Sequence, residues 1–434
     1  MSFSKEVIKV GLLGMGTVGR GVYRLLTENA EHIKNRIGAK VEIEKILVKD
    51  VKKNRGINID NSLLTVDVDD ILNNKDIDIV VEVIGGTGIA VDYVRRALGS
   101  GKSIVTANKD MMALHSKELF ELAAVNNCNI LFGASVAGAV PIIRTLRKSL
   151  ASDCVKSIYG IINGTTNYIL TKMTEEGADF NEVLKEAQAK GYAESDPTAD
   201  VEGYDAARKI AILASVAFNT HVILDNVYVE GITKISIDDI NYVSELGYVI
   251  KLLGIAKFKD EGIEVRVHPT MIPKNHLLAS VGGVFNAIFV NGSATGEMMF
   301  YGQGAGELPT ATAVVADVMD IAVDILRDVP KIVGSVGYIE KPTLSMGECE
   351  SRFYVKILIN DKPGVLASIA MVFGNEGISL DTVIQQDAKK PSDDTTELIF
   401  ITHTTKEKNL QNVLCCIKDL SVVREVKNVI RVEG

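Results

Sequence analysis

The residues best able to do chemistry lie in the stretch GYAESDPTADVEGYDAARK, residues 191–209. Five of its nineteen residues are acidic, and Arg208 and Lys209 close it. Asp205 and Lys209 are four residues apart, so on a helix they share one face. The next segment, IAILASVAF (210–218), carries no charge and predicts a helix buried on every side. Charges held at the start of a buried helix are usually functional or tightly paired, and the alternative is an ordinary surface ion pair.

Carboxylates and lysines placed together suit one kind of reaction. Carboxylates bind an amino group, and a lysine ammonium protonates a carbonyl oxygen as hydride reaches its carbon. This is the chemistry of a dehydrogenase that acts on an amino-acid aldehyde or alcohol. In the same region, NGTTNYIL (163–170) suits a turn followed by a helix start. Pro197 interrupts any helix through the acidic stretch, and Asp200 is predicted to be the N-cap of the next helix, from about Val201.

A dinucleotide-binding turn is predicted near the N-terminus. The apolar run VIKVGLL (7–13) leads into GMGTVG, and a helix is expected from 17 to about 36. Gly14 permits the tight turn, Gly16 lets the backbone approach a pyrophosphate, and Gly19 lets the helix pack against the strand. The alternative is a plain glycine turn. The free N–H groups of the helix start would hold the phosphates.

Further strands are expected at 41–48, 77–85, 103–108 and 129–134, separated by helical stretches. This alternation predicts a parallel sheet with crossover helices. The strand at 41–48 ends in a basic cluster that includes Lys53 and Arg55, with only Asp50 as a carboxylate among them. Such a cluster could bind a 2′-phosphate, which favours NADP without excluding NAD, and the alternative is a solvated charged loop.

Composition limits the function classes. The chain has 434 residues, which predicts two to four domains, and a net charge of −9, which argues against a nucleic-acid partner. None of the five cysteines forms a CxxC pair, so no zinc knuckle is expected. The sequence shows neither a signal-peptide pattern nor an apolar run of transmembrane length, so a cytoplasmic protein without a membrane partner is predicted.

The ordered motifs resemble homoserine dehydrogenase. They are GLLGMGTVG, ILVKD, VVEVIGG, VTANKD, ASVAGAVPII, GIINGTTNYIL, AQAKGYAESDPTADVEGYDAARK, VHPTMIP and YGQGAGELPTATAVVAD, from residue 7 to about 320. The resemblance implies reversible interconversion of aspartate 4-semialdehyde and homoserine with a nicotinamide cofactor. It also implies a place in threonine, methionine and isoleucine biosynthesis. The rival interpretations are a phosphorylating semialdehyde dehydrogenase, which needs a nucleophilic cysteine, and a catalytically silent amino-acid sensor.

The resemblance also implies roles for individual residues. Lys209 matches the proton donor of the family and Lys109 a second active-site lysine, although either could deliver the proton. Glu194 and Asp205 would hold the amino end of the substrate, with Asp200 partly structural beside them. The residues expected to contact the cofactor are Gly14, Gly16, Thr17, Val18, Gly19, Lys53, Arg55, Gly85, Lys109, Gly191 and Gly304.

One position departs from the family pattern. Family members often have Glu where this chain has Gly133, in a loop that binds a monovalent cation, which is expected to be sodium. Backbone carbonyls could still serve as ligands, because every residue has one. The expected ligands are Gly133, Val136, Gly138 and Val140.

The last eighty residues are predicted to be a separate module. Strands at 353–359, 378–386, 396–402 and 422–432 alternate with helices after 360 and at 406–420, the βαββαβ order of a ferredoxin-like unit. DKPGVLASIA followed by NEGISL resembles an ACT domain, a family of amino-acid-sensing modules that usually pair. The resemblance implies an effector, threonine being expected, near Gly364 of one copy and Asn375 and Ile378 of another. A purely dimerising module is the alternative.

The predicted fold class is therefore α/β, with three domains. Residues 1–135 form a Rossmann-type dinucleotide-binding domain, to which 310–330 return. Residues 136–309 form an α+β substrate-binding and dimerisation domain, and 353–434 form the ACT regulatory domain. A homodimer or homotetramer is expected.

Overall fold

The computed structural model describes residues 5–329, 340–386 and 395–434. The chain divides into two compact units. The described residues of Met1–Ile158, Arg208–Leu224 and Phe285–Lys341 form the first unit, and those of Tyr159–Ala207, Asp225–Val284 and Pro342–Gly434 form the second. The chain passes from one unit to the other within strand β7 (Val155–Ile161) and again within helix α10 (Tyr204–Ala217).

The first unit is built on a parallel sheet, as predicted. Its strand order is β3-β2-β1-β4-β5-β6, and every pairing is parallel. The strands are β1 (Val7–Leu13), β2 (Lys40–Leu47), β3 (Leu64–Thr65), β4 (Ile79–Glu82), β5 (Ser103–Thr106) and β6 (Ile130–Leu131). Strands β4 and β5 are buried at every residue, because helices cover both faces of such a sheet.

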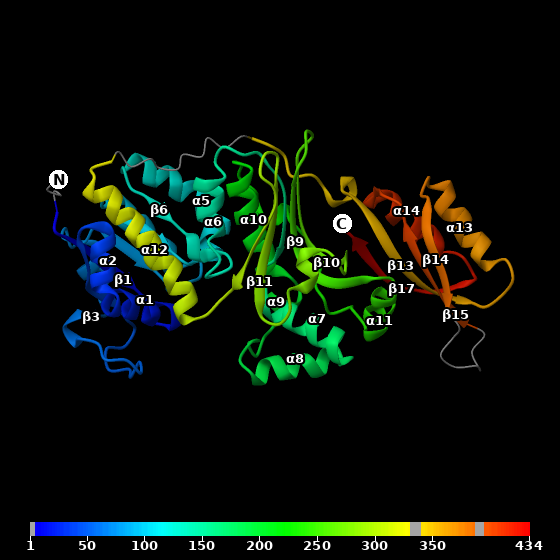
Figure 1. Ribbon diagram of the computed structural model, residues 1–434, viewed down its shortest axis with the longest axis horizontal. Coiled ribbons are helices and arrows are strands. Elements are labelled where there is room, and N and C mark those ends of the chain that lie inside the picture. The colour runs from blue at the N-terminus through cyan, green and yellow to red at the C-terminus, as the bar shows by residue number, and fades with distance from the viewer. Residues whose placement is uncertain (1–4, 330–339, 387–394) are drawn as a thin grey trace. The chain divides into compact units, whose positions relative to one another are not determined.

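Helices lie on this sheet (Figure 1). The helices of the first unit include α1 (Thr17–Glu28), α2 (Ala30–Ile37), α3 (Asp69–Leu72), α4 (Ile89–Gly99), α5 (Lys109–Val125), α6 (Ile142–Arg144) and α12 (Glu307–Leu326). The single helix expected from 17 to about 36 is in fact two, because Asn29 leaves the helical conformation between α1 and α2.

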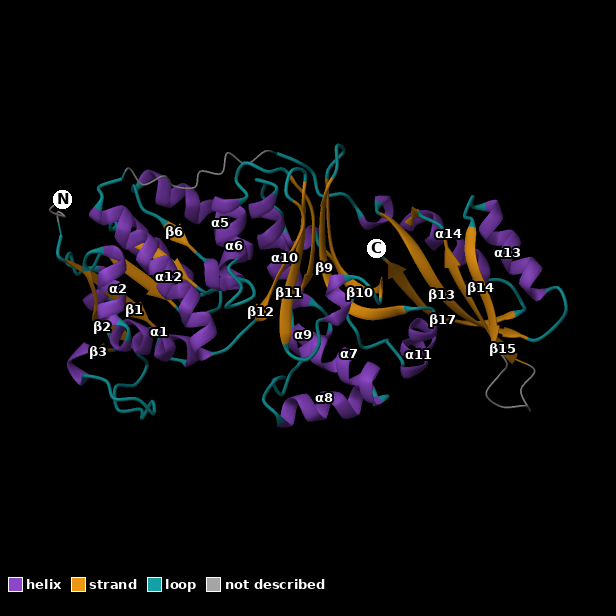
Figure 2. Cartoon of the chain, in the orientation of Figure 1, coloured by secondary structure: helices purple, strands orange, loops and turns teal. Residues whose placement is uncertain are grey.

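Helix α12 packs closely on α1. A Cβ on Gly21 of α1 would lie 2.6 Å from the carbonyl oxygen of Glu307 and 2.8 Å from the Cβ of Ala311, so the two helices meet where α1 has no side chain. Apolar residues of α12 share one core with α1, α2 and the central strands. The hairpin of β11 (Phe285–Gly292) and β12 (Gly296–Gln303) precedes α12 in the chain (Figure 2).

The second unit contains the segments that flank the acidic stretch. Its helices are α7 (Gly164–Glu176), α8 (Phe180–Ala189), α9 (Thr198–Val201) and α11 (Ile237–Glu245), and its strands include β8 (Tyr228–Val229), β9 (Tyr248–Phe258) and β10 (Ile263–Pro273). Strands β9 and β10 pair antiparallel over their whole length. Among the described residues, no helix of the chain is both long and apolar enough to cross a membrane.

The C-terminal module has the predicted βαββαβ order, with a short extra strand. Its elements are β13 (Glu350–Asn360), α13 (Val365–Asn375), β14 (Leu380–Gln386), β15 (Thr395–Thr402), β16 (Thr405–Lys406), α14 (Glu407–Lys418) and β17 (Val423–Val432). Alternate residues of β13 pack with α13 and α14 in one apolar core, so both helices cover the same face.

The final strand joins this module to the rest of its unit. Strand β17 pairs with β13 on one side and with β10 on the other, where Thr270 lies opposite Arg431. Fully buried Arg266 of β10 donates to Glu433 at 2.5 Å and to Glu264. Arg431 in turn donates to Glu407 at 2.7 Å and to Glu230. The junction is therefore a network of buried, paired charges.

Candidate functional site

The glycine-rich turn that follows β1 is shaped for close backbone approach. Gly14 has a φ of +109°, a conformation that other residues rarely adopt. A Cβ on Gly19 would lie 2.2 Å from the carbonyl oxygen of Gly14, so this position has no room for a side chain. A Cβ on Gly16 would meet nothing within 4 Å. The first turn of α1, with Thr17 and Val18, begins without a side-chain cap, so its N–H groups can bind a phosphate.

Alanine substitutions at the two positions should therefore separate binding from folding. Gly16→Ala is expected to weaken dinucleotide binding with little change in melting temperature, because its methyl group fills only open space. Gly19→Ala is expected to destabilise the fold, since overpacking typically costs about 1–3 kcal/mol. Cofactor titration and thermal denaturation of both variants provide the measurement. Equal melting temperatures for the two variants would contradict the assignment.

A buried carboxylate organises the loop after β4, and sequence reasoning missed it. Glu82 is fully buried, and one of its oxygens accepts hydrogen bonds from the N–H groups of Ile84 at 2.8 Å and Gly85 at 2.9 Å. Its other oxygen accepts from the hydroxyl of Thr106 at 2.6 Å. The available signal was a charged residue inside the apolar run 77–85. Glu82 thus fixes the Gly85 loop to the end of β5, at the carboxyl edge of the sheet.

The two candidate lysines lie on helices that meet in the first unit. Lys109 is the first residue of α5, which Asn108 caps through a 3.0 Å bond from the N–H of Met111. Its neighbour Asp110 pairs at 2.7 Å with Arg208, which precedes Lys209 in α10. This ion pair joins the start of α5 to the first turns of α10. The fold therefore brings together two helix segments that carry the predicted lysines.

The loop predicted to bind a cation is held by a side chain that the sequence did not single out. Asp317 of α12 is buried and accepts a 2.7 Å hydrogen bond from the N–H of Gly133. Burial raises the pKa of Asp317 to about 6. Its oxygens lie 3.0 Å and 3.2 Å from where a Cβ on Gly133 would be, so this carboxylate borders the space of the missing glutamate.

The loop backbone is compatible with carbonyl ligands. Gly138 has a φ of +45°, and the chain turns sharply there between the buried residues Val136 and Val140. The carbonyl of Val140 accepts from the N–H of Ile142 at 2.8 Å, and a carbonyl oxygen keeps a second lone pair for a cation. No cluster of three or more His, Cys, Asp or Glu suited to a metal occurs in the described parts of the chain. The cation site stays a prediction that rests on backbone oxygens.

Gly304 lies where two loops approach each other. A Cβ on Gly138 would lie 2.7 Å from the carbonyl oxygen of Gly304, so the predicted cation loop touches the GQGAG segment. A Cβ on Gly304 would itself lie 2.2 Å from the amide of Asn286, a residue of β11 that is 1% exposed. The glycine is therefore required by packing as well as by its predicted contact with the cofactor.

The acidic stretch folds differently from the prediction in one respect. Asp200 is not an N-cap: it lies inside α9, and the capping position before that helix is Pro197. The carboxylate of Asp196 accepts from the N–H of Thr198 at 3.1 Å instead. Gly203 then turns the chain into α10 with a φ of +86°. The prediction failed because one short helix and a glycine turn separate Asp200 from the buried helix.

Asp200 and Asp205 are brought together by a third residue. The side-chain nitrogen of Asn163 donates to Asp200 at 2.7 Å and to Asp205 at 2.9 Å. Asp205 is buried, whereas Glu194 has an exposed side chain and lies in the loop between α8 and α9. Gly191, just after α8, has a φ of +74°, a conformation that favours glycine at this position. The contact of Gly191 with the cofactor stays a prediction.

The basic loop after β2 is folded back on itself. Arg55 donates to the carbonyl oxygens of Lys53 at 2.8 Å and Asp50 at 2.5 Å. Arg20 of α1 donates to the carbonyl oxygen of Arg55 at 3.2 Å. The sequence motifs did not indicate this residue. Lys53 is exposed. The loop is thus a turn held by its own hydrogen bonds and by Arg20 of α1, rather than a solvated charged loop.

The three predicted effector residues differ in their surroundings. Gly364 is exposed, has a φ of +88° and stands directly before α13, with open space where a side chain would be. Asn375 is exposed at the end of that helix. Ile378 is 4% exposed and packs in the apolar core of the module, so only its backbone could face an effector.

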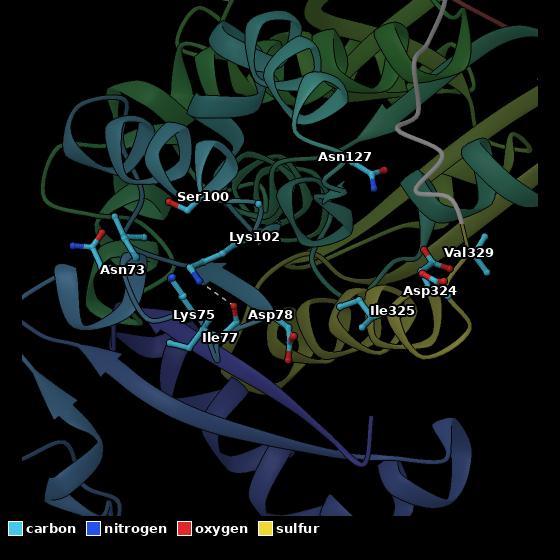
Figure 3. Close-up of a pocket in the computed structure, with 13 residues that line it drawn as sticks. Asn73, Lys75, Ile77, Asp78, Ser100, Lys102, Asn127, Asp324, Ile325 and Val329 are labelled. Atoms are coloured by element: carbon cyan, nitrogen blue, oxygen red, sulfur yellow. Dashed lines mark hydrogen bonds between the residues drawn. The ribbon is translucent and has the colours of Figure 1, made fainter. Parts of the chain in front are cut away.

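A pocket in the first unit lies at the wrong edge of the sheet for catalysis. Figure 3 shows Lys102 directed toward Ile77, to whose carbonyl oxygen it donates at 3.0 Å. Asp78 and Lys102 precede β4 and β5, so the pocket is at the amino ends of these strands. Open α/β sheets bind ligands outside the carboxyl ends of their strands. None of the predicted site residues lines this pocket.

Comparisons with known proteins agree with the geometry. The family model for homoserine dehydrogenase matches residues 141–319, the model for its NAD-binding domain matches 14–133, and the ACT domain model matches 353–421. The homoserine dehydrogenase of Bacillus subtilis is 44% identical over 431 residues, covering 99% of each chain. That of Neisseria gonorrhoeae is 45% identical and covers 98% of this chain and 99% of its own.

Solved structures give the same result. The crystal structure of a homoserine dehydrogenase from Thiobacillus denitrificans has a TM-score of 0.93 and 40% identity, covering 99% of this chain and 98% of that one. A hyperthermophilic archaeal homoserine dehydrogenase in complex with NADPH has a TM-score of 0.63 and 25% identity, covering 75% of this chain and 99% of that one.

Proposed function

Because the chain belongs to the homoserine dehydrogenase family of oxidoreductases, we propose that it interconverts L-aspartate 4-semialdehyde and L-homoserine. The observation that carries the proposal is helix α10, which bears Asp205 and Lys209 four residues apart. One is a carboxylate suited to the ammonium group of the substrate. The other is an ammonium suited to the oxygen at which the reaction occurs.

The protein's own residues then have separate tasks. A bound nicotinamide cofactor supplies or accepts the hydride at the carbon of the aldehyde or alcohol. Asp205, with Asp200 and Glu194, holds the substrate's amino end. Lys209 gives a proton to the aldehyde oxygen during reduction and receives it during oxidation, with Lys109 as the second lysine near that oxygen. The Gly16 turn and the first N–H groups of α1 bind the pyrophosphate.

A direct assay tests this function. Purified enzyme is incubated with NADPH or NADH and L-aspartate 4-semialdehyde, and absorbance at the nicotinamide band is followed together with formation of homoserine. The expected result is cofactor oxidation with one homoserine formed for each nicotinamide consumed. Activity that needs inorganic phosphate, or that is lost on thiol alkylation, would favour a phosphorylating semialdehyde dehydrogenase instead.

We propose NADP as the preferred cofactor, with NAD also accepted. The braced loop presents Lys53 and Arg55 after β2, where a 2′-phosphate would lie. The double variant Lys53→Ala/Arg55→Ala is expected to raise the Kd for NADP about tenfold or more and to change that for NAD little, since charged hydrogen bonds contribute about 1.5–3 kcal/mol. Titration with each cofactor gives the measurement.

Two controls make this prediction sharp. Lys40→Ala removes an exposed lysine from the other end of β2 and is expected to leave both affinities unchanged. Arg55 also braces the loop backbone, so Lys53→Ala alone tests charge without loosening the turn. Equal loss of NADP and NAD binding in the Lys53→Ala variant would mean that the loop supports the fold rather than the phosphate.

We further propose that threonine binds the ACT module and lowers activity, as expected for an enzyme at the head of threonine, methionine and isoleucine synthesis. Gly364→Asp is expected to abolish inhibition by crowding the exposed turn before α13, while basal turnover remains. A coupling free energy of about 1–3 kcal/mol would change activity several-fold or more. The measurement is turnover against threonine concentration.

A glycine elsewhere controls for backbone strain. Gly296 in the β11–β12 hairpin has a φ of +68° and open space around it, so Gly296→Asp imposes similar strain without touching the module. Threonine should still inhibit that variant. If the turnover of the wild-type enzyme does not change with millimolar threonine, the proposal that threonine is the effector is refuted. Isoleucine and methionine would then be tested. A cytoplasmic homodimer or homotetramer completes the proposed setting.

A further inference from the structure

Asn163 occupies a buried position from which it reaches the helix that it caps and two further helices, α9 and α10. It is the N-cap of α7 and is 5% exposed. Its side-chain oxygen accepts from the N–H of Thr166 at 2.9 Å and from the hydroxyl of the same residue at 3.0 Å. This side of the amide fulfils the ordinary capping role, for which serine, threonine or aspartate would serve equally well.

The nitrogen of the same amide has a different task. It donates to a carboxylate oxygen of Asp200 at 2.7 Å and to one of Asp205 at 2.9 Å, so each N–H meets an acidic side chain. The orientation of the amide is settled by these neighbours. Reversing it would set the oxygen against two carboxylates and the nitrogen against the Thr166 N–H, so the bonds to Asp200, Asp205 and that N–H would be lost.

Two carboxylates beside one another repel, and the repulsion is stronger where water is excluded. A neutral carboxamide that donates one N–H to each holds them together without neutralising them. The carboxamide thus adds no positive charge of its own beside the two carboxylates. A lysine or arginine in the same place would instead compete with the substrate's ammonium group.

We propose that Asn163 is a positioning residue that holds Asp200 and Asp205 as a pair for the substrate's ammonium group. By doing so it makes the enzyme select an amino-acid aldehyde over an aldehyde that lacks the amino group. The inference rests on the proposed function, because it assigns the pair to the amino end of aspartate semialdehyde. Asn163 contacts the carboxylates and acts through them.

A helix in the same unit shows what capping alone requires. Asp179 caps α8 through a single oxygen, which accepts from the N–H of Asn181 at 2.9 Å. Asn163→Ser keeps such an oxygen for α7 but removes both N–H donors. Asp179→Ala removes a cap without touching the acidic pair. The two variants thus separate the loss of a helix cap from the loss of the carboxylate bridge.

The test compares two aldehydes in NADPH-dependent reduction by the full-length enzyme. One is L-aspartate 4-semialdehyde, and the other is succinic semialdehyde, which has no amino group. For Asn163→Ser the KM for aspartate semialdehyde is expected to rise about tenfold or more, as for loss of a charge-assisted hydrogen bond, with a smaller change in kcat. The ratio of kcat/KM between the two aldehydes should fall by a similar factor. Asp179→Ala should leave this ratio unchanged.

A double-mutant cycle adds a second readout. If Asn163 acts through the pair, Asn163→Ser should have little further effect on the ratio in an Asp205→Asn background. Asn163→Thr, which also keeps a capping oxygen, replaces the serine variant should that fail to fold. An unchanged ratio in a folded Asn163 variant of an active enzyme overturns this inference alone. A wild type without aspartate semialdehyde activity overturns the proposed function itself.

Discussion

Lys209→Ala is expected to lose about 10²–10⁴-fold in kcat while retaining cofactor affinity, because general acid–base assistance has that magnitude. The lysine lies on α10, whereas the glycine turn that would hold the pyrophosphate precedes α1. Loss of the ammonium is therefore expected to affect the reacting oxygen and not the nucleotide. Steady-state turnover with aspartate semialdehyde, together with cofactor titration, provides the measurement.

Two neighbouring substitutions define what the loss means. Lys209→Arg keeps a positive charge on a group that does not release its proton near neutral pH, so it should stay impaired if Lys209 transfers a proton. Arg208→Ala breaks the ion pair with Asp110 but leaves both lysines in place, and it serves as the control for helix docking. A Lys209→Ala variant with more than half of wild-type turnover would move the role to Lys109.

Deletion of residues 349–434 is expected to yield no stable folded enzyme, rather than an active enzyme freed from regulation. Strand β10 would lose its neighbour β17 and expose an unpaired edge. Buried Asp239 of α11 would lose Lys356, its ion-pair partner at 2.5 Å, and Asn428, which donates to it at 2.9 Å. Thermal denaturation and size-exclusion chromatography of the truncated chain would show this.

A single substitution tests the same junction in the intact chain. Glu433→Gln leaves buried Arg266 with Glu264 and weakens the contact of Lys257 at 2.8 Å, so the free energy of unfolding should fall by about 3 kcal/mol. Glu348→Gln is the matched control, because that carboxylate pairs with Lys406 and Lys408 at the surface. For the chain that lacks residues 349–434, a wild-type melting temperature together with full turnover would refute the expected loss of folding. The response of that truncated chain to threonine could then be measured directly.

The arrangement of elements followed from local patterns. The apolar runs, the Gly14 to Gly19 turn and the βαββαβ order of the last eighty residues predicted the parallel sheet and the ferredoxin-like module. These patterns are readable because strand periodicity and turn chemistry depend on residues that are neighbours in the chain. The same local reasoning failed at Asn29 and at Asp200, where a helix break and a short extra helix replaced the expected boundaries.

The sequence by itself determined that Asp205 and Lys209 share one helix at a four-residue spacing, because that spacing is fixed by helix geometry. Only the tertiary structure decided what surrounds them. Asn163 reaches Asp205 across 42 residues, and Asp317 reaches Gly133 across 184. Such contacts depend on how separate elements pack, which no local pattern encodes. The amino-acid sequence therefore predicts which side chains belong to the candidate site. The packing of the elements decides which other residues hold those side chains in place.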